Sequence, residues 1–314
     1  YQLTAPKLYG TVQNDGATYS NSYKLLLNKG TANAYTVTSN IVTVRTPGDG
    51  DTTTLITPDK NNENADGVLI NDTVVALGTT NHYRLTWDLD QYKGDRSAKE
   101  TIARGFFFVD DYPEEVLDVV ENGTAITTLD GQKVSGITVK TYDSLNEAPK
   151  DLQDKLARAK ITPTGAFQVF MPDDNQAFYD QYVKTDTSLA LLTKMTVKDS
   201  LYGRTKTYTN KAYQVDFGNG YETKEVTNTL VSPEPKKQNL NKDKVDINGK
   251  PMLVGTQNFY TLSWDLDQYR GIKADNSQIA QGFYFVDDYP EEALLPDETA
   301  IQFVTSDGKT VSGI

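Results

Sequence analysis

Alternating apolar and polar positions run through most of the chain and predict β-strands. Residues 83–89 (YRLTWDL) carry an apolar side chain at every second position, the period of a strand with one buried face. Residues 106–109 (FFFV) are apolar throughout and predict a strand buried on both faces. Asp-Gly and Asn-Gly pairs such as those at 130 and 219 are typical of tight turns. The pattern therefore predicts an all-β sandwich.

One segment has the period of a helix instead. Residues 148–160 (APKDLQDKLARAK) have a proline near their start and place Leu152, Leu156 and Ala159 at helical spacing. We expect a short helix inserted in the sandwich, with Leu152 and Leu156 packed inward.

A long internal repeat organises the chain. YRLTWDLDQY at 83–92 returns as YTLSWDLDQY at 260–269, and GFFFVDDYPEE at 105–115 returns as GFYFVDDYPEE at 282–292. Both pairs are offset by 177 residues, which is the length of a whole domain rather than of a solenoid repeat.

A weaker similarity links residues 19–30 to residues 208–220 and indicates part of a further copy. The predicted domains are the C-terminal part of a first β-sandwich (1–46), a linker (47–57), a complete second β-sandwich (58–231), and the N-terminal half of a third, homologous domain (232–314).

Composition narrows the chemistry. The chain has 314 residues, a formal net charge of −12, no cysteine, and His82 as its single histidine. The absence of cysteine excludes disulfides and thiolate metal sites, and a single histidine nearly excludes a triad hydrolase. An acidic chain is also a poor partner for nucleic acid or anionic lipid, and we expect neither.

Two acidic segments, DLDQYKGD at 88–95 and DDYPEE at 110–115, recur at the same offset and suggest calcium, which prefers oxygen ligands. We expect Asp88 and Asp90 on one face of a strand; the alternative is that these acids only solvate turns. The candidate ligands are Asp88, Asp90, Tyr92 and Asp111, with Asp265, Asp267, Tyr269 and Asp288 in the third domain.

A chain without disulfides can instead be closed by an isopeptide bond between lysine and asparagine. That reaction needs a buried neutral amine and a protonated carboxyl group nearby. The candidates are Lys60, Asn210 and the acid Asp110, with Lys237, Asp287 and Asn21 at equivalent positions. The alternative for each lysine or asparagine is an ordinary surface residue.

The segments WDLDQYKG, FFFVDDYPEE and NKAYQVDFGNGY resemble the C-terminal region of streptococcal antigen I/II adhesins. The resemblance implies tandem immunoglobulin-like sandwiches of the DE-variant type, each with Ca2+ and a Lys–Asn isopeptide bond. Carried over, it implies a Lys60–Asn210 bond assisted by Asp110. The bonding partners of Lys237 and Asn21 would lie outside this chain.

Some members of that family bind another oral bacterium through a hydrophobic helix and a following strand. The matching positions here are 152–156 and 160–164, and the candidate contacts are Leu152, Leu156, Lys160, Ile161 and Pro163. A lysine at 155 replaces an apolar residue, and Pro163 removes a backbone donor from the expected strand, so these departures argue against the contact.

The resemblance further implies an extracellular, monomeric adhesin segment, anchored to the cell wall through a region absent from this chain. The implied partners are salivary agglutinin, a scavenger-receptor glycoprotein, or a matrix protein such as collagen, with other oral bacteria as further candidates. The alternative is a calcium-dependent, lectin-like module. We expect no enzymatic activity beyond formation of the internal bond.

Overall fold

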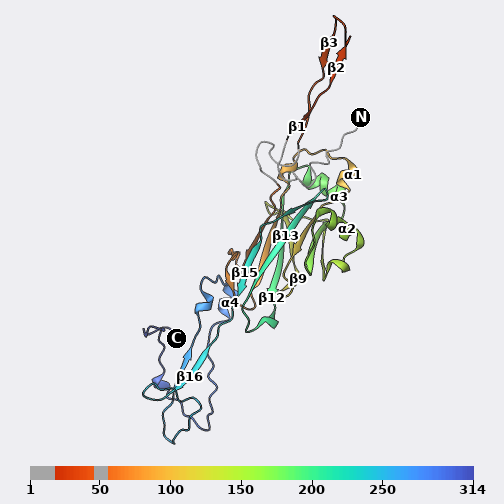
Figure 1. Ribbon diagram of the computed structural model, residues 1–314. Coiled ribbons are helices and arrows are strands. Elements are labelled where there is room, and N and C mark those ends of the chain that lie inside the picture. The colour runs from red at the N-terminus through yellow and green to blue at the C-terminus, as the bar shows by residue number, and fades with distance from the viewer. Residues whose placement is uncertain (1–17, 46–55) are drawn as a thin grey trace. The chain divides into compact units, whose positions relative to one another are not determined.

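The computed structural model describes residues 18–45 and 56–314, so most of the predicted linker 47–57 lies outside the described residues (Figure 1). The chain packs as two compact units, Tyr1–Gln278 and Ile279–Ile314. The first unit contains the predicted complete domain.

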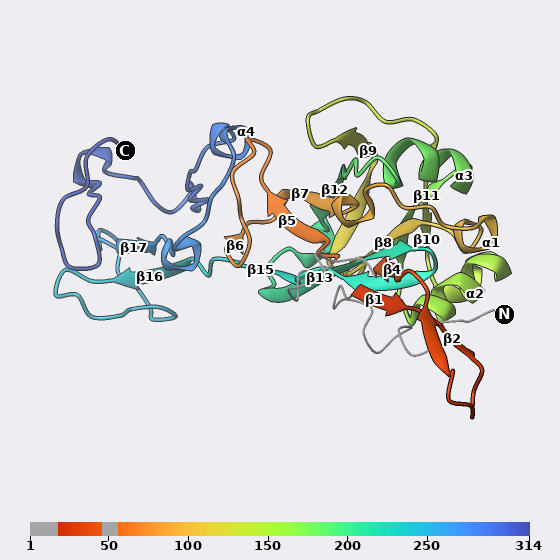
Figure 2. The same ribbon diagram turned by 90° about the horizontal axis from the view of Figure 1, so that it is seen from above.

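That domain consists of two β-sheets (Figures 1 and 2). The smaller sheet has the strand order β5 (Asp59–Glu63), β7 (Thr80–Trp87), β12 (Leu189–Val197) and β9 (Leu117–Thr128). The larger has the order β10 (Ile137–Tyr142), β11 (Phe167–Pro172), β8 (Phe107–Asp111), β13 (Lys206–Asp216), β15 (Val226–Leu230) and β6 (Val74–Val75), with β14 (Asn219–Glu222) also paired to β13. Neighbouring strands are antiparallel except for the parallel pair β15–β6.

Apolar side chains from both sheets meet between them. Leu85 and Trp87 of the smaller sheet share one buried cluster with Phe108 and Ala212 of the larger sheet. Strand β8 is buried on both faces, as predicted, because Phe107 lies in a separate cluster on the outer side of its sheet. The all-β sandwich is therefore confirmed.

Helix α2 (Lys150–Ala159) covers that outer side (Figure 2). The predicted helix is confirmed, and Leu152 and Leu156 are 2% and 0% exposed. No strand forms at 160–164, the positions that match the family's strand: Lys160 ends the helix in the left-handed conformation with φ 61°, and the next strand is β11. Ile161 and Pro163 are both buried.

Three shorter helices were not predicted: α1 (Lys99–Ile102), α3 (Asn175–Phe178) and α4 (Asn276–Ala280). Within the described residues, no helix has the length and apolar character needed to cross a membrane.

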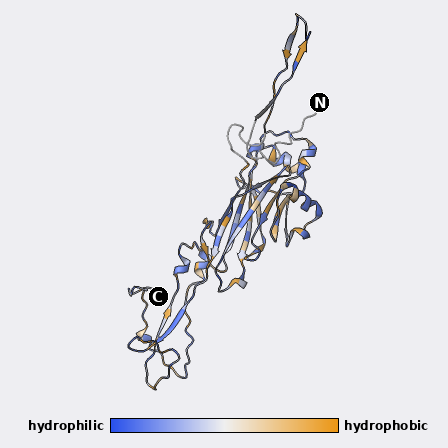
Figure 3. Cartoon of the chain, viewed as in Figure 1, coloured by the Kyte–Doolittle hydropathy of each residue, from blue (hydrophilic) through white to orange (hydrophobic). Residues whose placement is uncertain are grey.

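Strand pairs flank the sandwich in the sequence. They are β1 (Thr18–Asn21) with β4 (Val42–Arg45), β2 (Lys24–Leu27) with β3 (Tyr35–Thr38), and β16 (Lys236–Leu240) with β17 (Phe259–Ser263). Their apolar side chains are largely exposed. Figure 3 shows where the hydrophobic residues of the β2–β3 hairpin lie along the chain.

The registers of these pairs repeat those of the sandwich. Lys60 lies opposite Leu85 in β5–β7, and Lys237 lies opposite Leu262 in β16–β17, each shifted by 177 residues. Likewise, Asn210 faces Val226 in β13–β15, and Asn21 faces Val42 in β1–β4. Both sequence similarities thus correspond to the same local structure.

Candidate functional site

The predicted cross-linking residues of the middle domain converge inside the sandwich. Lys60 extends from β5 across the core, and its Nζ donates hydrogen bonds to Asp110 Oδ1 at 2.5 Å and to the backbone oxygen of Lys211 at 3.2 Å. Lys211 follows Asn210 directly in β13. The amine of the smaller sheet therefore reaches the strand of the larger sheet that carries the candidate asparagine.

Strand geometry places Asp110 and Asn210 on the same inward face. Asp110 of β8 lies opposite Ala212 of β13, and Asn210 precedes Ala212 by two positions. Because alternate residues of a strand share a face, Asn210 and Asp110 are diagonal neighbours. Lys60, Asp110 and Asn210 are each 0% exposed.

Several polar atoms at this point lack hydrogen-bond partners. They are Oδ2 of Asp110 and both Oδ1 and Nδ2 of Asn210. An unsatisfied buried polar group costs about 1–3 kcal/mol, so three such atoms on adjoining side chains form a costly arrangement. A carboxamide kept at such a cost is consistent with a chemical rather than a packing role.

Burial moves the amine and the acid toward their neutral forms. It lowers the pKa of Lys60 to about 8, although Asp110 opposes the change. It also raises the pKa of Asp110, opposed by Lys60 and by the side chain of Asn210. Both shifts favour transfer of the Lys60 proton to Asp110, which leaves a nucleophilic amine beside a protonated acid.

One of the equivalent residues in the flanking repeats, Lys237, has the same aromatic neighbour as Lys60. The Nζ of Lys237 lies 4.7 Å from the centroid of the Tyr260 ring, as that of Lys60 lies 5.0 Å from Tyr83. Asp287 belongs to the other compact unit, where it is exposed and outside any strand. Asn21 is exposed at the end of β1.

The first two candidate calcium ligands lie side by side, but in a turn after β7 and not on a strand as expected. The backbone N–H of Asp90 donates to Asp88 Oδ1 at 3.3 Å, and Asp88 Oδ2 accepts from the backbone N–H of Thr57 at 2.8 Å. Partial burial, Asp88 and the charge of Asp186 raise the pKa of Asp90. Three carboxyl groups thus influence one another here, and sequence reasoning missed Asp186.

The other candidate ligands are placed elsewhere. The hydroxyl of Tyr92 points inward to Asp216, and the carboxylate of Asp111 accepts hydrogen bonds from Thr164. No group of three acidic or histidine side chains in the described parts of the chain is arranged to hold a metal. The structure therefore does not bring Asp88, Asp90, Tyr92 and Asp111 into one site.

The third repeat has the same turn. Asp267 and Tyr269 bound a short 3-10 helix, as Asp90 and Tyr92 do. Asp265 accepts from the backbone N–H of Glu234, which repeats the Asp88–Thr57 contact at an offset of 177. Asp288, like Asp287, lies exposed in the other compact unit.

A buried aspartate was also missed. Asp216 is 0% exposed and accepts hydrogen bonds from Trp87 Nε1, the Tyr92 hydroxyl and Gln214 Nε2. Burial raises its pKa to about 7. It lies on the face of β13 that carries Asn210, so the period-2 pattern continued through 210, 212, 214 and 216 could have identified it.

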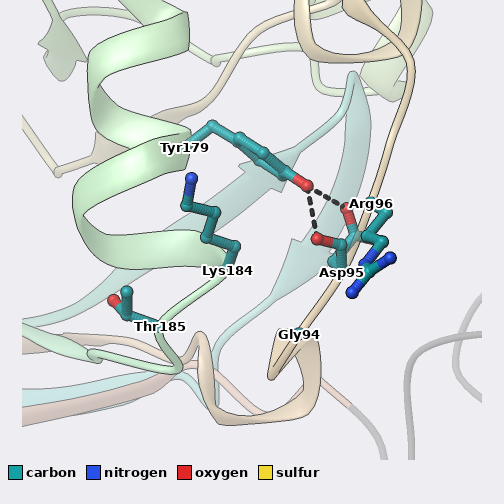
Figure 4. Close-up of a pocket in the computed structure, with 6 residues that line it drawn as sticks. All are labelled: Gly94, Asp95, Arg96, Tyr179, Lys184 and Thr185. Carbon is teal, nitrogen blue, oxygen red and sulfur yellow. Dashed lines mark hydrogen bonds between the residues drawn. The ribbon is translucent and has the colours of Figure 1, made fainter.

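A surface pocket lies next to the Asp88–Asp90 turn and is lined by Gly94, Asp95, Arg96, Tyr179, Lys184 and Thr185 (Figure 4). The Tyr179 hydroxyl donates to the backbone oxygen of Asp95 at 2.6 Å and lies 2.9 Å from its carboxylate, which fixes one wall. The Lys184 amine is paired with Asp180 at 2.5 Å. Of the two cations in the lining, Lys184 thus already has a partner.

The comparison with known proteins identifies both copies of the repeat. The family described as "Cell surface antigen I/II C2 terminal domain" matches twice, at residues 58–230 and 235–314. A curated relative, the aggregation substance of Enterococcus faecalis, is 29% identical over 242 residues, which are 75% of this chain and 16% of that protein. The chain thus spans a small part of this relative.

Two solved structures have the same fold. The C-terminal domain of the Streptococcus pyogenes antigen I/II-family protein AspA has a TM-score of 0.61 and 29% identity, covering 66% of this chain and 62% of that one. The C-terminal domain of the Streptococcus agalactiae AgI/II polypeptide BspA has a TM-score of 0.54 and 29% identity, covering 65% and 60%.

Proposed function

Because the chain belongs to the family of cell surface antigen I/II C2 terminal domains, we propose that it is a stalk segment of a bacterial adhesin, closed by an isopeptide bond between Lys60 and Asn210. The observation that carries the proposal is the fully buried cluster of Lys60, Asp110 and Asn210 between the two sheets. The domains would be DE-variant immunoglobulin sandwiches, as the resemblance implies.

The chemistry uses only groups already in the core. Lys60 gives a proton to Asp110, and the neutral Nζ attacks Cγ of Asn210. The C–N bond to the Asn210 amide nitrogen then breaks, and that nitrogen leaves as ammonia with a second proton from Nζ. Asp110 relays protons and stabilises the carbonyl oxygen. The products are one secondary amide, one ammonia and a protonated Asp110, so atoms and charge balance.

Such a bond supports a load-bearing role. It joins β5 near the start of the domain to β13 near its end and closes a loop of about 150 residues. By analogy with disulfides, a cross-link around so long a loop stabilises by roughly 4–5 kcal/mol. A sandwich closed in this way resists being pulled apart from its two ends.

Intact mass tests the bond. We expect the full chain to be lighter than its sequence mass by one ammonia, and Lys60→Ala or Asp110→Ala to abolish the deficit. Both variants should also lose thermal stability, because the unfolded chain is no longer constrained. Lys155→Ala, a change on the surface of α2, should keep the deficit. An unmodified mass for the unaltered chain would exclude the proposal.

We also propose that Ca2+ binds at the turn after β7, held by Asp88 and Asp90 with Asp186 as a further acidic neighbour. The support is that the backbone N–H of Asp90 donates to Asp88 Oδ1 in a turn that recurs at 265–269, so two carboxylates of the kind that divalent cations bind lie side by side. Asp265 and Asp267 are the equivalent pair of the third repeat. Bound calcium would supply a charge that ties this turn together.

Calcium removal distinguishes this proposal from the alternative, in which these acids only solvate the turn and bind no metal. We expect a chelator to lower the melting temperature, and Asp90→Ala to lose bound calcium by atomic emission. Asp130→Ala, at an exposed turn of the same domain, should retain it. The absence of bound calcium, together with a melting temperature that a chelator leaves unchanged, would contradict the proposal.

For location and partners, we propose the outer surface of a Gram-positive cell, with anchoring to the wall and monomeric action. The partners would be host glycoproteins such as salivary agglutinin or collagen, with other oral bacteria as further candidates. The lectin-like alternative would use the pocket of Figure 4, because Gly94 N–H donates to the backbone oxygen of Lys184 and so joins the turn to the pocket wall. Chelator-sensitive glycan binding by the folded chain would favour it.

A further inference from the structure

One side chain at the cross-linking site has no role in the chemistry above. Tyr83 of β7 is 0% exposed, and its hydroxyl has no hydrogen-bond partner. Buried tyrosine hydroxyls usually have one, so this group needs an explanation.

Its position is set by the two sheets. Tyr83 lies opposite Asn62 of β5 and so occupies the same face as Lys60, two residues away. The Lys60 Nζ lies 5.0 Å from its ring centroid. Tyr83 therefore lines the core beside the attacking amine.

Its hydroxyl and both polar side-chain atoms of the other reactant, Asn210, lack hydrogen-bond partners in the same core. Burial, followed by the neighbouring Tyr208 and Asp110, raises the pKa of Tyr83 well above its ordinary value, and the side chain of Asn210 acts against this rise. Asn210 is thus among the groups that influence the Tyr83 hydroxyl, although no hydrogen bond joins the two side chains. The hydroxyl stays protonated at neutral pH and is available as a donor.

We propose that Tyr83 is a second catalytic residue of cross-link formation, whose hydroxyl donates to Asn210 Oδ1 as negative charge develops there in the tetrahedral intermediate. Attack by Lys60 converts the planar carboxamide into a tetrahedral centre and moves its oxygen, so a donor that is misaligned before the reaction can align during it. Tyr83 keeps its proton throughout, and the proton balance is unchanged. The inference rests on the proposed Lys60–Asn210 bond.

The third repeat has the same arrangement. Tyr260 follows Tyr83 at the offset of 177 and lies beside Lys237. The lysine–tyrosine pair thus belongs to the repeated unit, in keeping with a function shared by the repeats.

The test compares two variants, each of which removes the hydroxyl oxygen of one buried tyrosine. Tyr208→Phe removes the hydroxyl of a tyrosine that neighbours Tyr83 but already donates to Asn81 Oδ1 at 3.2 Å. The full chain is made by cell-free synthesis, translation is stopped, and the fraction lacking one ammonia is followed by intact mass. Melting temperatures are compared between samples with the same fraction of cross-linked chain.

We expect Tyr83→Phe to slow ammonia loss by roughly 100-fold, the usual effect of removing one oxyanion donor, with little change in melting temperature. Tyr208→Phe should do the reverse, since it breaks a hydrogen bond outside the reaction. Wild-type rates for Tyr83→Phe, or equal slowing by both variants, would overturn the role of Tyr83 alone. A wild-type chain that never loses ammonia would instead overturn the proposed bond.

Discussion

At the scale of single residues, the sandwich buries polar groups at positions where apolar side chains would avoid the free-energy cost of desolvation. A fully buried ion pair is weak evidence for stability, because desolvation offsets the attraction between the charges. The Lys60–Asp110 pair is better understood as an acid and an amine whose pKa shifts favour the neutral forms. Reaction with Asn210 would remove both the charge and the unsatisfied amide.

The single histidine, His82, allows a pKa shift caused by burial to be measured. Burial lowers the pKa of His82 below 6.5, assisted by Lys194 and Arg84. The folded chain then binds fewer protons than the unfolded chain as pH falls through that range, so His82 should reduce stability on acidification. NMR titration of the imidazole should give a midpoint below 6.5; a midpoint at or above 6.5 would contradict this.

Residue roles were only partly predictable from sequence. Lys60 and Asn210 are about 150 positions apart, and the repeat together with the family resemblance nominated them. The sequence contained no signal that the Tyr92 hydroxyl would turn inward, since that orientation depends on Asp216 of β13, 124 residues away. Contacts of this kind arise from sheet pairing, which local pattern does not encode.

At the scale of elements, periodicity predicted the parts of the fold that a single strand or helix determines. The uninterrupted apolar run at β8 reflects burial under both the second sheet and α2. The absence of a strand directly after α2 has a local reason. Lys160 closes the helix in a left-handed conformation, and the Ile161 N–H bonds back to the oxygen of Leu156.

Helix α2 should therefore stabilise the domain through packing. Leu156 is 0% exposed in the cluster between α2 and the larger sheet, so Leu156→Ala should cost about 2–5 kcal/mol in unfolding free energy. Lys150→Ala on the same helix should cost about 0.5 kcal/mol or less, because Lys150 and its partner Asp154 are both exposed. Urea unfolding measures both, and equal losses would contradict this packing role.

At the scale of the whole molecule, one sequence appears in two environments. Phe107 and Val109 are 1% and 0% exposed where β13 and β11 pair with β8, whereas their counterparts Tyr284 and Val286 are each 77% exposed. In the described structure residues 282–290 form no strand, whereas β8 pairs on both sides. The two copies of the apolar segment thus differ in strand pairing as well as in exposure.

The repeats also explain why one cross-link per domain would matter. The bond would connect the first and last parts of a sandwich, so force applied along an array would pass through a covalent link rather than through sheet hydrogen bonds alone. The matching registers of β5–β7 and β16–β17 indicate that the strand pair carrying the lysine occurs in both repeats.

Tryptic peptide mapping tests the central claim most directly. With Lys60 acylated, trypsin cannot cut after it, and residues 46–84 should be recovered as one peptide joined to residues 207–211 with the loss of one ammonia. Fragmentation should locate the junction at Lys60 and Asn210. Recovery of the separate peptides 46–60 and 207–211 at their unmodified masses would contradict the account.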